Sequence, residues 1–178
     1  MGQIRLEPVT RDHIIPPIDC GHDDIHAMMS EAFIMTLQKQ GTAYNVLLNQ
    51  RIVGQCMLRM YTINDEDYES TYSGHEFACI KIQYLCIDVG YQNKGIGTLA
   101  QLMILKKTRE IIKNLPIRFI YIEAVQNREE WFKKFAFSRI PEGVTLANPH
   151  NTEVTVPMCI DCMDHIAVQD YNDWMIGD

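Results

Sequence analysis

The chain has 178 residues, a net charge of −7, 47% hydrophobic residues and 22% charged residues. This length is close to the commonest size of one compact domain, and the composition excludes disordered and fibrous classes. We expect one domain over residues 1–178, with a core at about 3–162 and a C-terminal tail at 163–178.

Membrane and nucleic-acid partners are both disfavoured by the sequence. No apolar stretch approaches the ~20 residues that a membrane-spanning helix needs, and the N-terminal residues carry no apolar signal core. We therefore expect a cytoplasmic protein. The negative charge disfavours a broad nucleic-acid surface, although Lys106, Lys107, Arg109 and Lys113 form one basic cluster.

Hydrophobic periodicity and turn residues predict a mixed α/β order, with antiparallel hairpins first and alternating strands and helices later. The predicted strands cover residues 3–8, 43–48, 51–63, 77–88, 117–125, 137–140 and 154–162. The predicted helices cover residues 23–40, 95–113 and 127–135, the last with Asn127 as its N-cap. The dipeptide Asn49-Gln50 predicts a hairpin turn, and the apolar run 117–125 indicates a central strand covered on both faces.

The most informative segment is the run IDVGYQNKGIGT at residues 87–98. A strand is predicted to end near Asp88 and a helix to begin near Gly95, so the amides from Asn93 to Thr98 would be free donors at a helix N-terminus. Glycine lets the backbone approach a ligand closely, and Lys94 adds positive charge. Such a loop binds a phosphate or diphosphate group.

Three phosphate-loop patterns compete for this segment. The Walker pattern GxxxxGK[ST] is absent. The run GIGTLA satisfies the dinucleotide fingerprint GxGxx[GA], but that fingerprint places its first glycine directly at the strand end, whereas residues 89–94 intervene here. The third pattern fits best. Gln92-x-x-Gly95-x-Gly97 resembles the QxxGxG signature of the GNAT superfamily of acetyl-CoA-dependent N-acetyltransferases.

A second family element supports the resemblance. GNAT proteins typically carry an Asn after the next strand, then a helix that ends in a Tyr-x-x-x-Gly-Phe pattern. This chain has Asn127 and then Phe132, Ala136 and Phe137 at the corresponding spacing. The resemblance implies an α/β (α+β) fold of GNAT type, with a mostly antiparallel twisted sheet flanked by helices and a coenzyme cleft between the fourth and fifth strands.

The resemblance also implies a binding site for acetyl-CoA as co-substrate, without a metal. The diphosphate would lie on a loop of seven residues: Gln92, Asn93, Lys94, Gly95, Ile96, Gly97 and Thr98. Main-chain amides of Leu85, Cys86 and Ile87 would bind the thioester and the pantetheine arm. Asn127 would hydrogen-bond that arm, with Phe132 at the same site.

Two departures from the family pattern concern proton transfer. The Tyr that often protonates the departing thiolate corresponds to Phe132, and the carboxylate that many members carry as general base corresponds to Lys81. We therefore take Glu76, acting through water, as the candidate base and Tyr84 as the candidate acid. A solvated hairpin carboxylate and a core aromatic are the structural alternatives for these two residues.

The resemblance implies direct attack of a primary amine on the thioester in a ternary complex. An acidic segment that contains Asp65, Glu66, Asp67, Glu69 and Glu76 would border the acceptor groove and favour a small cationic amine or a peptide N-terminus. A solubilising loop is the other interpretation of these acids.

Two alternative functions stay open. The runs QYLCIDVGYQNKGIG and VPMCIDC also resemble toxin-type acetyltransferases that act on aminoacyl-tRNA, although those toxins usually carry a Tyr at the position of Phe132 and are basic. A non-catalytic acyl-CoA-binding module would explain the missing Tyr and the missing strand carboxylate.

The remaining candidates for special chemistry have simple explanations. His22 and His26 lie one helical turn apart without an evident third ligand, so we expect no metal site. The six cysteines are expected as reduced thiols, with Cys159 and Cys162 as small hydrophobic residues. The sequence leaves open whether the tail packs on its own domain or on a second subunit of a homodimer.

Overall fold

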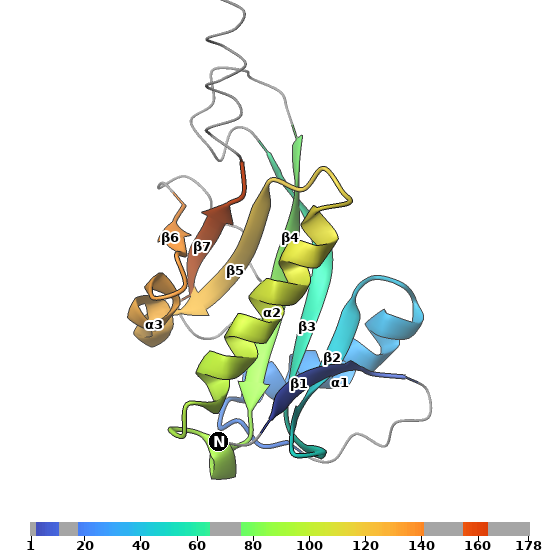
Figure 1. Ribbon diagram of the computed structural model, residues 1–178, viewed down its shortest axis with the longest axis vertical. Helices are drawn as coiled ribbons and strands as arrows, with labels where there is room; N and C mark the ends of the chain where they lie inside the picture. Colours follow the sequence, from blue (N-terminus) through green and yellow to red (C-terminus); the bar gives the residue numbers. More distant parts are fainter. Residues whose placement is uncertain (1–2, 11–17, 65–75, 141–154, 164–178) are drawn as a thin grey trace, which may run out of the picture.

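The computed structural model describes residues 3–10, 18–64, 76–140 and 155–163. One seven-stranded sheet runs through these residues in the order β1-β2-β3-β4-β5-β7-β6 (Figure 1). Its strands are β1 (Ile4–Pro8), β2 (Thr42–Leu48), β3 (Arg51–Asn64), β4 (Glu76–Ile87), β5 (Phe119–Val125), β6 (Ser138–Arg139) and β7 (Thr155–Asp161). Every neighbouring pair is antiparallel except β4 and β5, which are parallel. The mostly antiparallel sheet predicted from the sequence is confirmed.

The first four strands form a meander of successive hairpins. Asn49 and Gln50 join β2 to β3 with φ angles of 49° and 71°. Two positive φ angles are the mark of a type I′ turn, whose twist matches that of the flanking strands. The predicted hairpin is therefore confirmed. The acidic segment between β3 and β4 falls at residues 65–75, outside the described residues.

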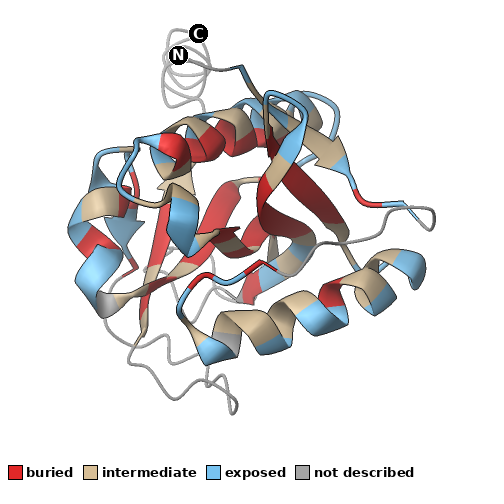
Figure 2. Ribbon diagram, turned by 90° about the horizontal axis from the view of Figure 1, so that it is seen from below, coloured by how far each residue is buried: buried red, intermediate tan, exposed pale blue. Residues whose placement is uncertain are grey.

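Helices cover both faces of the sheet (Figure 2). They are α1 (Asp23–Leu37), α2 (Ile96–Ile112) and α3 (Glu129–Lys133), with the 3-10 turns η2 (Val89–Tyr91) and η3 (Gln126–Arg128). On one face α2 buries Ile104 and Leu105 in the main core cluster. On the other face α1 packs against a smaller cluster, and Ala32 is its one fully buried residue among those described. The sheet is thus covered deeply by α2 and more thinly by α1.

The helix after β5 begins later than the sequence predicts. The chain leaves β5 through η3, so the N-cap of α3 is Arg128 and no side chain caps this helix. The prediction that Asn127 caps the helix is wrong, because the tight 3-10 turn takes up the residues on which the first α-helical turn was expected. The other predicted helices are confirmed with ends one to three residues shorter. Within the described residues, no helix is long and apolar enough to cross a membrane.

Candidate active site

A pocket of about 330 Å³ opens where β4 and β5 separate. The two strands pair only from Cys79↔Phe119 to Ile82↔Ile122. After Ile82, β4 keeps its partner β3 but pairs with no described residue on the β5 side, and Gln83 to Ile87 line the pocket. Alternate main-chain groups of this free edge therefore point into the pocket rather than into a ladder. Leu85, Cys86 and Ile87 lie on this edge, and their contact with a thioester and a pantetheine arm stays a prediction.

A β-bulge marks the point of separation. Leu58 pairs with Ile82 and Met57 with Tyr84, so Gln83 is an extra residue in β4. Regular alternation would place Ile82 and Tyr84 on the same face. Instead Ile82 packs in the cluster beneath α2, whereas Tyr84 packs beneath α1. After the bulge, the side chains of β4 that would have faced α2 face α1, and those that would have faced α1 face α2.

The N-terminus of α2 forms one wall of the pocket. Its N-cap is Gly95, which has a φ of 75° and offers no side chain to the first amides of the helix. The main chain of Ile96, Gly97 and Thr98 therefore presents donors without intrahelical partners, in a field that favours an anion. Gly95, Gly97 and Thr98 line the pocket, as does Asn93 in the preceding loop. Ile96 itself points into the core and is buried.

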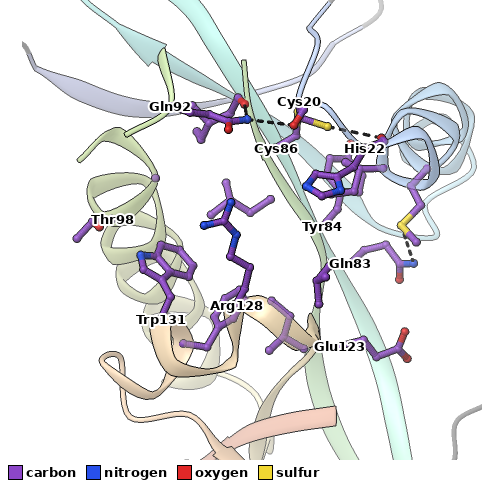
Figure 3. Close-up of a pocket in the computed structure, with 18 of the residues that line it drawn as sticks. Cys20, His22, Gln83, Tyr84, Cys86, Gln92, Thr98, Glu123, Arg128 and Trp131 are labelled. Carbon is purple, nitrogen blue, oxygen red and sulfur yellow. Dashed lines mark hydrogen bonds between the residues drawn. The ribbon is translucent and has the colours of Figure 1, made fainter. Parts of the chain in front are cut away.

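Gln92 and Lys94 use their side-chain nitrogens to hold the backbone of the loop. The side-chain nitrogen Nε2 of Gln92 donates to the backbone carbonyl oxygens of Cys20 and Ile87, at 3.0 and 2.9 Å. Gln92 therefore joins the end of β4 to the segment before α1, at the pocket wall (Figure 3). Lys94 donates to the carbonyl of Gly90 at 2.6 Å and lies over the ring of Tyr91. The ammonium group of Lys94 thus interacts with groups of the loop itself, and Lys94 is not among the residues that line the pocket.

The opposite wall comes from α3. Trp131 and Phe132 line the pocket, and the two rings pack edge to face with centroids 4.7 Å apart. Phe132 is buried and packs on Phe137, so it presents carbon and no proton donor. Arg128 also reaches the pocket, and Figure 3 shows its guanidinium directed into the space beside Trp131. Asn127 is exposed and is not a lining residue, so its contact with a pantetheine arm stays a prediction.

The two predicted proton-transfer residues occupy different parts of β4. Glu76 is the first residue of the strand and pairs with Asn64. It lies seven positions before Gln83 at the pocket, which is roughly 23 Å along an extended strand. Tyr84 does line the pocket, but its hydroxyl donates to Oε1 of Gln55 at 2.6 Å, and burial raises its pKa. Both features make proton release harder. The structure therefore brings Tyr84 to the pocket and leaves Glu76 outside it.

We expect Tyr84→Phe to affect stability more than turnover. The change removes a buried hydrogen bond and leaves Oε1 of Gln55 without its donor, a loss of about 1–3 kcal/mol in the free energy of unfolding. Chemical denaturation and steady-state rates across pH 6–9 would be measured together. A tenfold fall in turnover with little loss of stability would instead support Tyr84 as the acid.

The sequence interpretation missed a charged pair on the α1 side of the pocket. Nζ of Lys81 lies 2.8 Å from Oε1 of Glu123, and the two side chains are only 9% and 11% exposed. The hydroxyl of Tyr121 donates to the same oxygen at 3.3 Å, and the ammonium lies over the rings of Tyr61 and Tyr121. Glu123 lines the pocket, and Figure 3 shows its side chain near that of Gln83. β5 thus brings a carboxylate beside the strand position that Lys81 occupies.

The signal for Glu123 was present in the sequence. It is the one carboxylate in the apolar run 117–125, and a charge on a buried central strand needs a partner. Parallel pairing of β4 with β5 sets Lys81 opposite Tyr121, so Glu123 lies two residues further on the same face. That register depends on tertiary packing, so the sequence pattern alone does not predict it.

Metal ligands do not gather among the described residues. No group of three His, Cys, Asp or Glu side chains comes together in the described ranges. Nε2 of His26 instead accepts from the backbone amide of Cys20 at 3.2 Å. This contact fixes the segment before α1.

Comparison with known proteins gives structural neighbours only. No protein-family model matches the chain, and no curated protein sequence matches it. A solved structure described as a bacterial toxin is similar at a TM-score of 0.73, with 16% identity over 96% of this chain and 97% of that one. AtaT complexed with acetyl-methionyl-tRNAfMet is similar at 0.68, with 14% identity over 87% and 94%. A Tyr-to-Phe mutant of the AtaT toxin, bound to the C-terminus of the antitoxin AtaR and to acetyl-CoA, is similar at 0.65, with 16% identity over 88% and 93%.

These likenesses cover almost the whole of each chain, although the sequences have diverged widely. The separated parallel strands β4 and β5 and the glycine loop before α2 are both in the places that the GNAT resemblance implies. The chain has the fold of the GNAT N-acetyltransferases, in the form seen in these toxin structures.

Proposed function

We propose that this protein is an acetyl-CoA-dependent N-acetyltransferase whose acceptor is the α-amine of an aminoacyl-tRNA. The observation that carries the proposal is the pocket between the separated ends of β4 and β5, which reaches the uncapped N-terminus of α2. Such a pocket can hold a long thioester in one direction and admit an amine in the other.

The chain's own residues suit the coenzyme. The free amides at the start of α2 would hold a diphosphate. A Cβ built on Gly97 would lie 3.8 Å from Ile87 and 3.9 Å from Trp131, so the glycine keeps open the space between two lining residues. The free edge of β4 would bind the pantetheine arm and direct an amide at the thioester oxygen, where negative charge develops during attack.

The acceptor amine must reach the thioester without its proton. An alkylamine with a pKa near 10.4 is neutral in about one molecule in 10³ at pH 7, whereas an α-amine with a pKa near 8 is neutral in roughly one in ten. An α-amine therefore needs less help from a base than an alkylamine does. This argument favours the aminoacyl acceptor over the polyamine or aminoglycoside that the acidic segment suggested.

Glu123 is our candidate for the group that holds the amine and takes its proton. It is an acidic residue in the pocket wall, and Lys81 and Tyr121 both bind its Oε1, which fixes the carboxylate. Oε1 of Gln83 is buried without a hydrogen-bond partner among the described residues, and it would accept a second N–H from the acceptor. The departing thiolate needs less help, because a thiol has a pKa near 8.5 and water can protonate it.

Two further points bear on the choice of acceptor. AtaT, which has the same fold, has been captured with acetyl-methionyl-tRNAfMet. The net charge of −7 favours the second candidate, a small cationic amine, because it opposes binding to a polyanion.

The test is acetyl transfer from radiolabelled acetyl-CoA to a panel of amines. The panel contains aminoacyl-tRNA, free amino acids, a polyamine, an aminoglycoside and a peptide N-terminus, with thermal stabilisation by acetyl-CoA as the binding control. We expect label on aminoacyl-tRNA at least tenfold faster than on the other amines. Faster labelling of the polyamine would contradict the aminoacyl acceptor and support a small cationic amine as the substrate. Stabilisation without any transfer would support the non-catalytic coenzyme-binding module instead.

A further inference from the structure

Two thiols meet at the edge of the pocket, and the mechanism above uses neither. Cys20 precedes α1 and Cys86 lies on β4, and both line the pocket (Figure 3). Both pack in the same buried cluster beneath α1, close enough for each thiol to shift the pKa of the other. A pair of thiols in contact, far apart in sequence, has the arrangement that thiol–disulfide exchange requires.

The backbone on both sides of the pair is fixed. The carbonyl of Cys20 accepts from Gln92, and its amide donates to His26. The thiol of Cys20 donates to the carbonyl oxygen of His22, the N-cap of α1, at 3.8 Å. Cys20 is therefore held at the pocket wall immediately before α1.

The two thiols differ strongly in acidity. The neighbouring thiol of Cys86, with smaller contributions from the backbone of His22 and from the two histidines, lowers the pKa of Cys20 to about 6. Burial raises the pKa of Cys56 and of Cys79 to about 12, and that of Cys159 to about 11. The neighbouring Cys20 and burial raise the pKa of Cys86. Cys20 is thus the more acidic thiol of the pair.

We infer that Cys20 is a modification site for low-molecular-weight disulfides that enter the pocket, above all a disulfide that carries coenzyme A, and that Cys86 resolves the adduct. The Cys20 thiolate attacks one sulfur of the disulfide R–S–S–R, a Cys20–S–S–R bond forms, and R–S⁻ leaves. Cys86 then attacks the Cys20 sulfur, its proton passes to the departing second R–S⁻, and a Cys20–Cys86 disulfide remains. Two protein thiols are oxidised and one disulfide is reduced to two thiols.

The preference for a coenzyme-bearing disulfide rests on the proposed function, because the same pocket would hold the coenzyme beside Cys20. The first adduct would fill the pocket with the coenzyme and exclude acetyl-CoA. The mixed disulfide on Cys20 would thus block coenzyme binding until Cys86 resolves it.

The experiment treats the reduced protein with coenzyme A disulfide or with cystamine, which lacks the nucleotide, and reads the products by intact mass and peptide mapping. We expect the wild type to end as a Cys20–Cys86 disulfide, Cys86→Ser to keep one coenzyme A on Cys20, and Cys20→Ser to gain neither product. Cys162, which is more exposed than the other thiols described, is the internal control and should react at least ~10-fold more slowly.

The pattern of outcomes separates this inference from the proposed function. Rapid modification of Cys20 by coenzyme A disulfide and slow modification by cystamine supports both. Equal rates with the two reagents support the reactive thiol and contradict a coenzyme pocket. Labelling of Cys162 before Cys20, or no exchange at Cys20 with either reagent, overturns the inference.

A pH series of iodoacetamide labelling provides a second test. The groups that face the pair are His22 and His26 at the start of α1, Asp19 before it and Asp88 after β4. We expect the labelling rate of Cys20 to rise through about pH 6 and then level off. A rate that keeps rising to pH 8.5, as for an ordinary thiol, would contradict the proposed thiolate.

Discussion

Glu123→Gln is expected to lower kcat/KM for the acceptor by about 10²-fold or more, which is the usual contribution of a general base, while acetyl-CoA still stabilises the protein against heat. The amide keeps the size of the side chain but cannot take a proton or hold a cationic amine. Initial rates at varied acceptor concentration, with a thermal-shift titration of acetyl-CoA on the same sample, would measure both effects.

A structural role for the Lys81–Glu123 pair must be separated from this effect. Removing one partner leaves a buried charge, which costs about 3–5 kcal/mol of folding free energy, whereas removing both charges is often neutral. The double variant Lys81→Met with Glu123→Gln therefore serves as the control. We expect it to recover the melting temperature but not the turnover. Recovery of both would contradict a role for Glu123 in the reaction and leave the pair as a folding contact.

The sequence predicted most of the fold because local rules and the fold agree over long stretches. The hairpin at Asn49-Gln50 and the glycine-ended loop before α2 each depend on backbone conformations that few residues adopt. Short-range chemistry was enough to place both. The boundary at Asn127 failed because a 3-10 turn and an α-helical turn have similar local signals, and the packing around the end of β5 decides between them.

The missing parts of the site depend on contacts between distant segments. The extra residue Gln83 moves Tyr84 to the α1 face, and no residue in the sequence of β4 predicts a bulge at this position. The contact between Lys81 and Glu123 depends on the register of two parallel strands, and the contact between Cys20 and Cys86 joins positions 66 residues apart. Family resemblance indicated the loop at which we propose that the coenzyme binds, whereas the charged and nucleophilic groups of the pocket come together through contacts between distant segments.

Gly97→Ala is expected to weaken acetyl-CoA binding by at least ~10-fold, the equivalent of about 1.4 kcal/mol, without destabilising the protein. The new methyl would make ordinary contacts with Ile87 and Trp131, at 3.8 and 3.9 Å, so the protein alone accommodates it. Alanine also favours a helix over glycine by up to ~1 kcal/mol, so the melting temperature should stay the same or rise. The methyl would, however, stand where a diphosphate approaches the first amides of α2. Isothermal titration calorimetry with acetyl-CoA, and a melting curve of the free protein, would test the two halves of this expectation.

Gly95→Ala is the matched control. It adds the same methyl group two residues earlier, where we expect a lower melting temperature instead of an unchanged or higher one. Gly95 has a φ of 75°, and no atom lies within 4 Å of a Cβ built on it. An alanine there meets no neighbour, but the left-handed backbone costs about 1–2 kcal/mol, so the melting temperature should fall. Loss of coenzyme affinity in Gly97→Ala with an unchanged fold would locate the diphosphate at the start of α2. Wild-type affinity in Gly97→Ala would mean that the anion does not approach this turn, and the coenzyme site would then have to lie elsewhere.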